Sequence, residues 1–173
     1  MAERGMLEVK NPSEAFIENP KINKAGSCTV VTMQGLRPVL VEIQALSVKS
    51  QLPAPRRLTR GVDNNRLQIL CAVLQKNAGI PLYNQDIFLS VAGGLHLSEP
   101  AIDFGICLAV ASSYKNKALP EKSVAVGEVG LLGELRKVSF LEKRIKQAKA
   151  LGYTRIISPR AYLTVTEAIR KLL

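Results

Sequence analysis

Residues 99–111 of the chain read Glu-Pro-Ala-Ile-Asp-Phe-Gly-Ile-Cys-Leu-Ala-Val-Ala, and this stretch decides the fold. The residues after Gly105 are apolar nearly all round, which is typical of a buried helix, so we predict a central helix from about Pro100 to Tyr114. The turn that opens this helix carries two carboxylates, Glu99 and Asp103, and residues 99–105 contain neither a hydroxyl nor a thiol. It resembles an active-site turn without a nucleophile.

Strands are predicted on the N-terminal side of this helix. β-Branched residues are frequent in 27–33 and 37–48, and Gln34-Gly35 between them predicts a β-hairpin. A further strand is expected at 86–91, with a kink or bulge at Gly93-Gly94 and a continuation over 95–97. Residues 53–61 are expected to form an extended basic loop, because their two prolines exclude a helix.

The remaining elements mix short strands with helices. Asp63 and Thr164 are expected to cap two helices, the first ending at 77–79 and the second at the C-terminus. A third, amphipathic helix is predicted over 140–151. Residues 123–129 and 131–138 predict a strand pair, and 155–158 a short strand. Because hairpins and helices alternate without a regular βαβ order, the predicted class is α+β, or mixed α/β.

Length and composition are those of one globular domain. The 173 residues suffice for a hydrophobic core without a disulfide or metal. No run of about 18 apolar residues could cross a bilayer, and the N-terminus lacks a signal-peptide pattern, so a cytoplasmic location is expected. Cys28, Cys71 and Cys107 are predicted to be reduced core thiols. Residues 1–24 are expected to be a lead-in segment before a domain at 25–173.

The net charge of +10 is concentrated in two segments. Residues 36–61 carry five basic groups and one acidic group, and residues 100–173 carry thirteen against six. Such asymmetry favours a polyanionic partner, because neutralised phosphates release counterions. In the first segment, three guanidiniums on a proline-stiffened loop form a fork suited to phosphate or carboxylate: those of Arg56, Arg57 and Arg60.

Motifs for other chemistries are weak or missing. The chain has no phosphate-binding Gly-x-x-x-x-Gly-Lys-Ser/Thr loop, and the glycines of 127–133 fall between predicted strands, where they serve bends. The single histidine, His96, lies two residues from Ser98 with no carboxylate placed to orient its ring, so we interpret it as a surface residue. Glu99 and Asp103 near a helix start are explained by the positive end of the helix dipole.

Several short strings of residues are weak signals singly, but their order and spacing along the chain make a specific pattern. They are Asn11-Pro12-Ser13, residues 37–46, Pro55-Arg56-Arg57, residues 61–67, Gly93-Gly94, residues 99–103 and residues 127–131. Together they resemble the C-terminal part of the RadA family of bacterial DNA-repair proteins, also called Sms, and the resemblance spans nearly the whole chain. That part of the family is similar to the proteolytic domain of Lon and to the second domain of ribosomal protein S5.

The resemblance implies a ring-forming, ATP-driven DNA motor that promotes branch migration of recombination intermediates. In such proteins a zinc finger and a RecA-like ATPase come before the Lon-like domain, so ATP, Mg and Zn are expected only in those parts and no cofactor in this chain. The partners implied are single-stranded or branched DNA and further copies of the protein in a homo-hexamer, with no membrane.

The same resemblance gives a reason for the turn without a nucleophile. Lon-type proteases carry the catalytic serine in a Pro-Ser-Ala-Gly string, and aligning its glycine with Gly105 puts Asp103 at the serine position. The catalytic lysine aligns with Glu142, one residue before Lys143. A Ser-Lys dyad needs a hydroxyl that attacks and an amine that takes its proton, so this mechanism is predicted to be lost.

The leading hypothesis is an inactive Lon-like domain that serves ring assembly and non-specific DNA contact. The predicted DNA-contacting residues are Lys49, Arg56, Arg57, Arg60, Lys143, Arg144, Lys146 and Lys149. A residual serine peptidase or peptide-binding domain would instead use Ser98, Ser112 or Ser113, although the last two lie about two and a half turns into the helix. A third reading is a pure oligomerisation module whose arginines bridge subunits.

Overall fold

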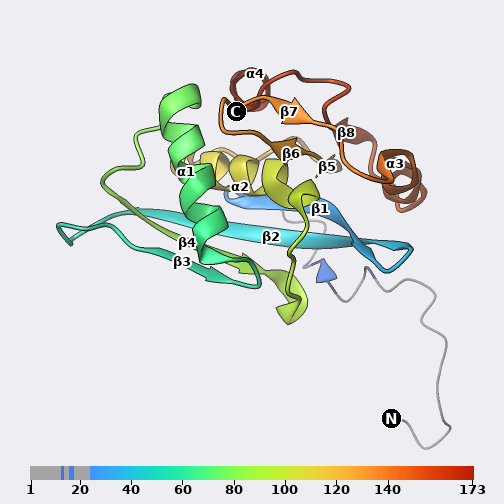
Figure 1. Cartoon of the computed structure of the whole chain (residues 1–173), viewed down its shortest axis with the longest axis horizontal. Helices are drawn as coiled ribbons and strands as arrows, with labels where there is room; N and C mark the ends of the chain where they lie inside the picture. The colour runs from blue at the N-terminus through green and yellow to red at the C-terminus, as the bar shows by residue number, and fades with distance from the viewer. Residues whose placement is uncertain (1–12, 14–15, 18–23) are drawn as a thin grey trace, which may run out of the picture.

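The computed structural model describes residues 13, 16, 17 and 24–173, and its centre is a mixed sheet with the strand order β3-β4-β2-β1-β5-β8 (Figure 1). β1 pairs antiparallel with β2, and β2 pairs antiparallel with β4. The outer pairs, β3 with β4, β1 with β5 and β5 with β8, are parallel. The strands are β1 (Ser27–Gln34), β2 (Arg37–Lys49), β3 (Arg57–Arg60), β4 (Gln85–Val91), β5 (Ser123–Ala125) and β8 (Arg155–Ile157).

Helices cover the two faces of this sheet unequally. α1 (Asn64–Ala78), α2 (Asp103–Lys115) and α4 (Val165–Leu172) pack together on one face (Figure 1). α3 (Leu141–Ala150) packs on the other face, where a second apolar cluster joins it to Val31, Leu40 and Val124. Because successive strand residues point to opposite faces, Val30 and Val41 face α2 while Val31 and Leu40 face α3. A mixed sheet with four helices in the described part confirms the α+β class.

The central helix is as buried as its composition predicts. Every residue of α2 from Asp103 to Ser112 is buried, and a short 3-10 turn (Pro100–Ile102) leads into it. Gly105 lies where α2 comes closest to β1, and a Cβ atom built there would be 2.1 Å from Cγ1 of Val30. Contact this close requires glycine, since Val30 is itself fully buried.

Replacing Gly105 with alanine should lower the free energy of unfolding by about 1–2 kcal/mol. Overpacking a core costs roughly 1–3 kcal/mol, and the helix propensity of alanine returns at most about 1 kcal/mol. Urea unfolding measures the difference. In a Val30→Ala background, which removes the clashing methyl group, the same substitution should be neutral or stabilising. An equal cost in both backgrounds would show that the contact is not the cause.

Local signals in the sequence are confirmed at the helix ends and the hairpin. The side chains of Asp63 and Thr164 accept hydrogen bonds from the amides of Arg66 and Glu167, both at 3.1 Å, and so cap α1 and α4. Gly79 ends α1 in the left-handed conformation. β1 and β2 form the expected hairpin. The three cysteines are buried, which confirms that they are core residues.

Three element predictions are corrected. Residues 57–60 are the edge strand β3 rather than a loop, because they gain the backbone of β4 as a parallel partner. Residues 95–97 do not continue β4, which ends in a short 3-10 turn (Ala92–Gly94). The pair predicted from 123–138 is divided: β5 joins the main sheet, while β6 (Glu128–Val129) and β7 (Leu135–Arg136) form a separate two-stranded sheet.

The lead-in predicted for residues 1–24 lies almost entirely outside the described residues. Of that segment, Ser13 is buried and its hydroxyl accepts a hydrogen bond from the amide of Leu40 at 3.1 Å. Phe16 and Ile17 pack against the two apolar clusters. Among the helices that the structure describes, none has the length and apolar character needed to span a bilayer.

Candidate functional site

The turn before α2 is held in place by backbone hydrogen bonds to the segment that follows β5. The amide of Gly127 donates to the carbonyl of Ala101 at 2.9 Å, and the amide of Phe104 donates to the carbonyl of Gly127 at 3.1 Å. Gly127 therefore joins the turn to the segment after β5 through two backbone hydrogen bonds. These bonds fix where the two carboxylates of the turn point.

Asp103 is a buried carboxylate at the first residue of α2. Nε of Arg66 lies 2.6 Å from its Oδ1, in an ion pair whose geometry leaves that oxygen without a well-formed hydrogen bond. The Val129 amide also donates to the carboxylate. Burial raises the pKa of Asp103 to about 6, because the favourable charge of Arg66 and these contacts offset only part of the cost of desolvation.

Glu99 is held by a different arginine. Nη1 and Nη2 of Arg144 donate to its two carboxylate oxygens at 2.9 and 2.6 Å, and the Met33 amide donates at 2.9 Å. Burial acts to raise the pKa of Glu99, but the hydrogen bonds from Arg144, Thr32 and the Met33 amide bring it below its usual value. Glu99 thus stays ionised and joins α3, β1 and the turn before α2.

Arg144 is the centre of this contact and not a surface group. Its side chain is 2% exposed, and it also donates to the carbonyls of Val31 at 2.6 Å and Ser139 at 3.0 Å. The prediction of Arg144 as a DNA-contacting residue requires an outward side chain, and this is corrected: the residue packs inward with Leu141 and Ala148. Its guanidinium makes four hydrogen bonds inside the protein, so this structure does not present it to DNA.

The partners of Glu142 differ from those of Asp103. Glu142 is exposed in the first turn of α3, where both its oxygens accept hydrogen bonds from Arg160.

The three serines considered as nucleophiles in the sequence have other roles or positions in the structure. The buried Ser112 hydroxyl donates to the carbonyl of Lys117 at 2.6 Å and accepts from the Gly26 amide, and Ser113 accepts from the Ser47 amide at 2.9 Å. Ser98 is exposed, and its carbonyl accepts from Arg66.

The predicted arginine fork is divided between the two faces of the sheet. Arg57 points to the α1 side, where it donates to the carbonyls of Leu82 at 2.6 Å and Gln85. Arg56 and Arg60 belong to the opposite face, since they alternate with Arg57 along the chain. The Arg56 amide lies 2.7 Å from Asp86 and lowers the pKa of that carboxyl, while the Arg56 side chain makes a 3.4 Å ion pair with it. Lys49 is exposed at the end of β2.

The other three predicted residues on α3 are exposed. Lys143, Lys146 and Lys149 lie on the solvent side of the helix, and Lys143 also donates to the carbonyl of Leu36. We call these three residues the basic face of α3. His96 is exposed as well, as its interpretation as a surface residue requires. No cluster of three or more His, Cys, Asp or Glu side chains suited to a metal ion occurs in the part of the chain that the structure describes.

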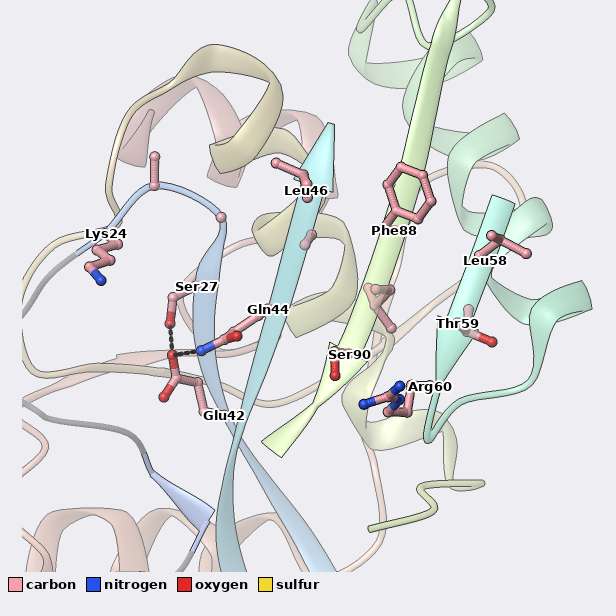
Figure 2. Close-up of a pocket in the computed structure, with 14 residues that line it drawn as sticks. Lys24, Ser27, Glu42, Gln44, Leu46, Leu58, Thr59, Arg60, Phe88 and Ser90 are labelled. Atoms are coloured by element: carbon pink, nitrogen blue, oxygen red, sulfur yellow. Dashed lines mark hydrogen bonds between the residues drawn. The ribbon is translucent and has the colours of Figure 1, made fainter. Parts of the chain in front are cut away.

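A groove that sequence reasoning missed lies on the same sheet face as α3. Beyond α3, no described element covers this face, and it forms a concavity of about 680 Å³ across β1, β2, β4 and β3 (Figure 2). We call it the open groove; its lining includes Lys24, Ser27, Glu42, Gln44, Leu46, Leu58, Arg60, Phe88 and Ser90. Leu46 and Val48 alternate with more polar residues near the end of β2, and this pattern in the sequence predicts an apolar strand face. It does not predict whether another element covers that face.

Comparison with known proteins gives the chain a family context. No protein-family model matches it. DNA repair protein RadA of Halalkalibacterium halodurans is 48% identical over 159 residues, which are 92% of this chain and 35% of that protein. The corresponding values are 48%, 94% and 36% for Bacillus subtilis RadA and 46%, 95% and 39% for Streptococcus pneumoniae RadA.

The chain therefore spans somewhat more than a third of the length of these curated relatives. The matched 35–39% of each RadA protein is about the length of one domain. This agrees with the resemblance to the C-terminal part of the RadA family that the short sequence strings predicted. Over 92–95% of its length, the chain is similar to a C-terminal segment of RadA, a bacterial DNA repair protein.

Proposed function

We propose that this chain is a non-catalytic module of a RadA-type DNA repair protein, which contacts DNA without sequence preference and helps to assemble a homo-hexameric ring. The observation that carries the proposal is the basic face of α3, in a chain of net charge +10 whose relatives are named for DNA repair. Exposed lysines attract the phosphate backbone and release its counterions, which supplies affinity but no base selectivity.

The absence of catalysis is supported by the contacts of the turn before α2. A Ser-Lys dyad would need a hydroxyl at position 103 that an amine can deprotonate, whereas Asp103 has no hydroxyl in its ionised form and is a buried carboxylate paired with Arg66. Glu142, at the position where the resemblance puts the lysine, is paired with Arg160. We infer that a Lon-like site has become a set of structural ion pairs in this chain, and that processing of branched recombination intermediates depends on the ATPase of the whole protein.

Assembly is supported by apolar side chains that the described part of the chain leaves uncovered. Leu131 and Leu132, in the turn between β6 and β7, are 71% and 83% exposed, and Leu163 before α4 is 77% exposed. The backbone of Leu163 bonds to Leu135 in β7, so these leucines belong to neighbouring segments. Clustered exposed leucines mark surfaces that a partner covers, and in a ring that partner is the next subunit.

Removing two lysines from the basic face of α3 tests the DNA contact. The variant Lys146→Ala/Lys149→Ala should bind duplex DNA more weakly than the unaltered chain at about 50 mM salt. Its plot of log affinity against log salt should be less steep by about 1.8, because each phosphate contact contributes roughly 0.9 to the slope. Fluorescence anisotropy across a salt titration measures both quantities.

The matched control is Lys76→Ala/Lys115→Ala, which removes the same charge from exposed positions in the last turns of α1 and α2. It should change the slope little. If both double variants lower the salt slope equally, DNA binding depends on the net charge of the chain and not on the basic face of α3. If the slope of the α3 variant is unchanged, this face is not the DNA contact. If DNA binding is absent but light scattering shows a ring that dissociates on Leu132→Ser substitution, the module is one of assembly alone.

A further inference from the structure

The open groove and the basic face of α3 belong to one side of the sheet. α3 covers the half of this side that contains Val31 and Leu40, and the strand alternation continues from Leu40 through Glu42 and Gln44 to Leu46. Tyr153, just beyond α3, lies with its hydroxyl 3.5 Å from Thr29 on β1, at the boundary between the two halves. A ligand lying along this side could therefore contact both.

An apolar row crosses the floor of the open groove. Leu46 on β2 is in register with Phe88 on β4, which is in register with Leu58 on β3. Leu46 and Leu58 are 54% and 51% exposed, and the ring of Phe88 lies half-buried between them (Figure 2). A flat apolar group placed on this row would contact an aromatic ring below and a leucine on either side.

Polar groups lie one register step further along the same strands. Gln44 pairs with Ser27 and Ser90, and Ser90 pairs with Arg60, which is exposed (Figure 2). In the described part of the chain, no acidic side chain bonds to Arg60. Its charge is therefore available at the β3 end of the groove.

A carboxylate distinguishes the other end. Glu42 accepts hydrogen bonds from the Ser27 hydroxyl at 2.6 Å and the Gln44 amide group at 3.1 Å, and the residue is 7% exposed (Figure 2). Lys24 also lines this end, so its charge and that of Glu42 offset each other, whereas the described lining residues include no carboxylate at the Arg60 end. An anionic group in the groove would therefore lie at Arg60. Ser90, which carries a hydroxyl, lies between the two ends.

We propose that the open groove binds a nucleotide of single-stranded nucleic acid, with its base on the Leu46–Phe88–Leu58 row and its phosphate at Arg60. A volume of about 680 Å³ is in the usual range of small-ligand sites. The ligand must combine a flat unpaired ring with a negative charge, and a duplex hides the faces of its bases. This inference rests on the proposed DNA contact at the basic face of α3, and it adds that the groove beside that face selects single-stranded DNA.

The test compares single-stranded and duplex DNA in one assay. Phe88→Leu keeps the groove apolar but removes the stacking ring, and should weaken binding of an oligothymidine of about 15 nucleotides roughly 5- to 30-fold while leaving duplex binding unchanged. Arg60→Gln should lower the salt slope for the single strand by about 0.7. Leu58→Ser, at an edge-strand position where the side chain is 51% exposed, should also weaken single-strand binding selectively.

Tyr83→Leu is the matched control, because Tyr83 is an aromatic residue that is 72% exposed outside the groove lining. It should have no effect. If the Phe88 and Leu58 variants bind the single strand normally while Lys146→Ala/Lys149→Ala still weakens DNA binding, the groove proposal is overturned and the proposed function stands. If none of these variants alters DNA binding, both fail. If the groove variants change only self-association, the occupant is a second copy of the chain.

Discussion

Arg144→Ala is expected to lower the free energy of unfolding by about 3–5 kcal/mol, the cost of removing one partner from a buried ion pair. The substitution leaves the Glu99 carboxylate without its bidentate partner and removes the donors to the carbonyls of Val31 and Ser139. Because these contacts join α3 to β1 and to the turn before α2, the loss should affect the whole domain. Urea unfolding followed by circular dichroism measures it.

Two controls separate this effect from loss of charge. Arg160→Ala removes an exposed arginine from its pair with Glu142 and should change stability little, since exposed ion pairs contribute little. In the double variant Glu99→Gln/Arg144→Met, both charges are absent and an apolar chain fills the space, so much of the loss should be recovered. Equal destabilisation by Arg144→Ala and Arg160→Ala would contradict the role assigned to the buried pair.

Asp103 should make the protein less stable as the pH rises from about 4 to 6. Its pKa is raised from 3.8 to about 6 in the folded state, so in this window the folded chain holds a proton that the unfolded chain has lost. The stabilising contribution is complete below pH 3.8 and is lost as the pH passes through 6. The raised pKa corresponds to a total of about 3 kcal/mol.

The measurement is the difference in unfolding free energy between the unaltered chain and Asp103→Asn at pH 4, 5, 6 and 7. Taking the difference removes the contributions of other carboxyls, such as Glu99, whose pKa is lowered and whose stabilisation is lost at lower pH. Relative to the variant, the unaltered chain should lose stability up to about pH 6 and then level off. Arg66→Gln removes a charge that lowers the pKa of Asp103, and should move this window to higher pH. A difference that is constant with pH would show that Asp103 ionises normally.

Local elements of the fold could be predicted because their causes are local. Asp63 and Gly79 limit α1 through bonds that each makes with its own helix, and the hairpin of β1 and β2 is set by the turn at Gly35-Leu36, one residue beyond the expected Gln34-Gly35. The buried central helix follows from its unbroken apolar composition. The 57–60 strand could not be predicted in this way, because its hydrogen-bonding partner, β4, comes more than twenty residues later in the chain.

The candidate site was predicted less completely than the fold. The turn with Glu99 and Asp103 was identified from sequence, but its two arginine partners were not, because Arg66 and Arg144 come from α1 and α3. Helical spacing places Arg144 on the same stripe as Leu141 and Ala148, so a signal for an inward side chain was present in the sequence. Which carboxylate it meets depends on the packing of α3 on the sheet. Likewise, the sequence grouped Arg56, Arg57 and Arg60, whereas strand alternation places Arg57 on the opposite face.

By itself, then, the sequence determined the α+β class, the helix caps, the buried central helix, the excess of positive charge and the resemblance to RadA. Each of these depends on composition or on residues near one another in the chain. The tertiary structure alone decided which arginine neutralises each carboxylate of the 99–103 turn and which basic residues remain exposed. It also created the open groove, since a sheet face is left uncovered only when the helices that could pack on it have been placed elsewhere.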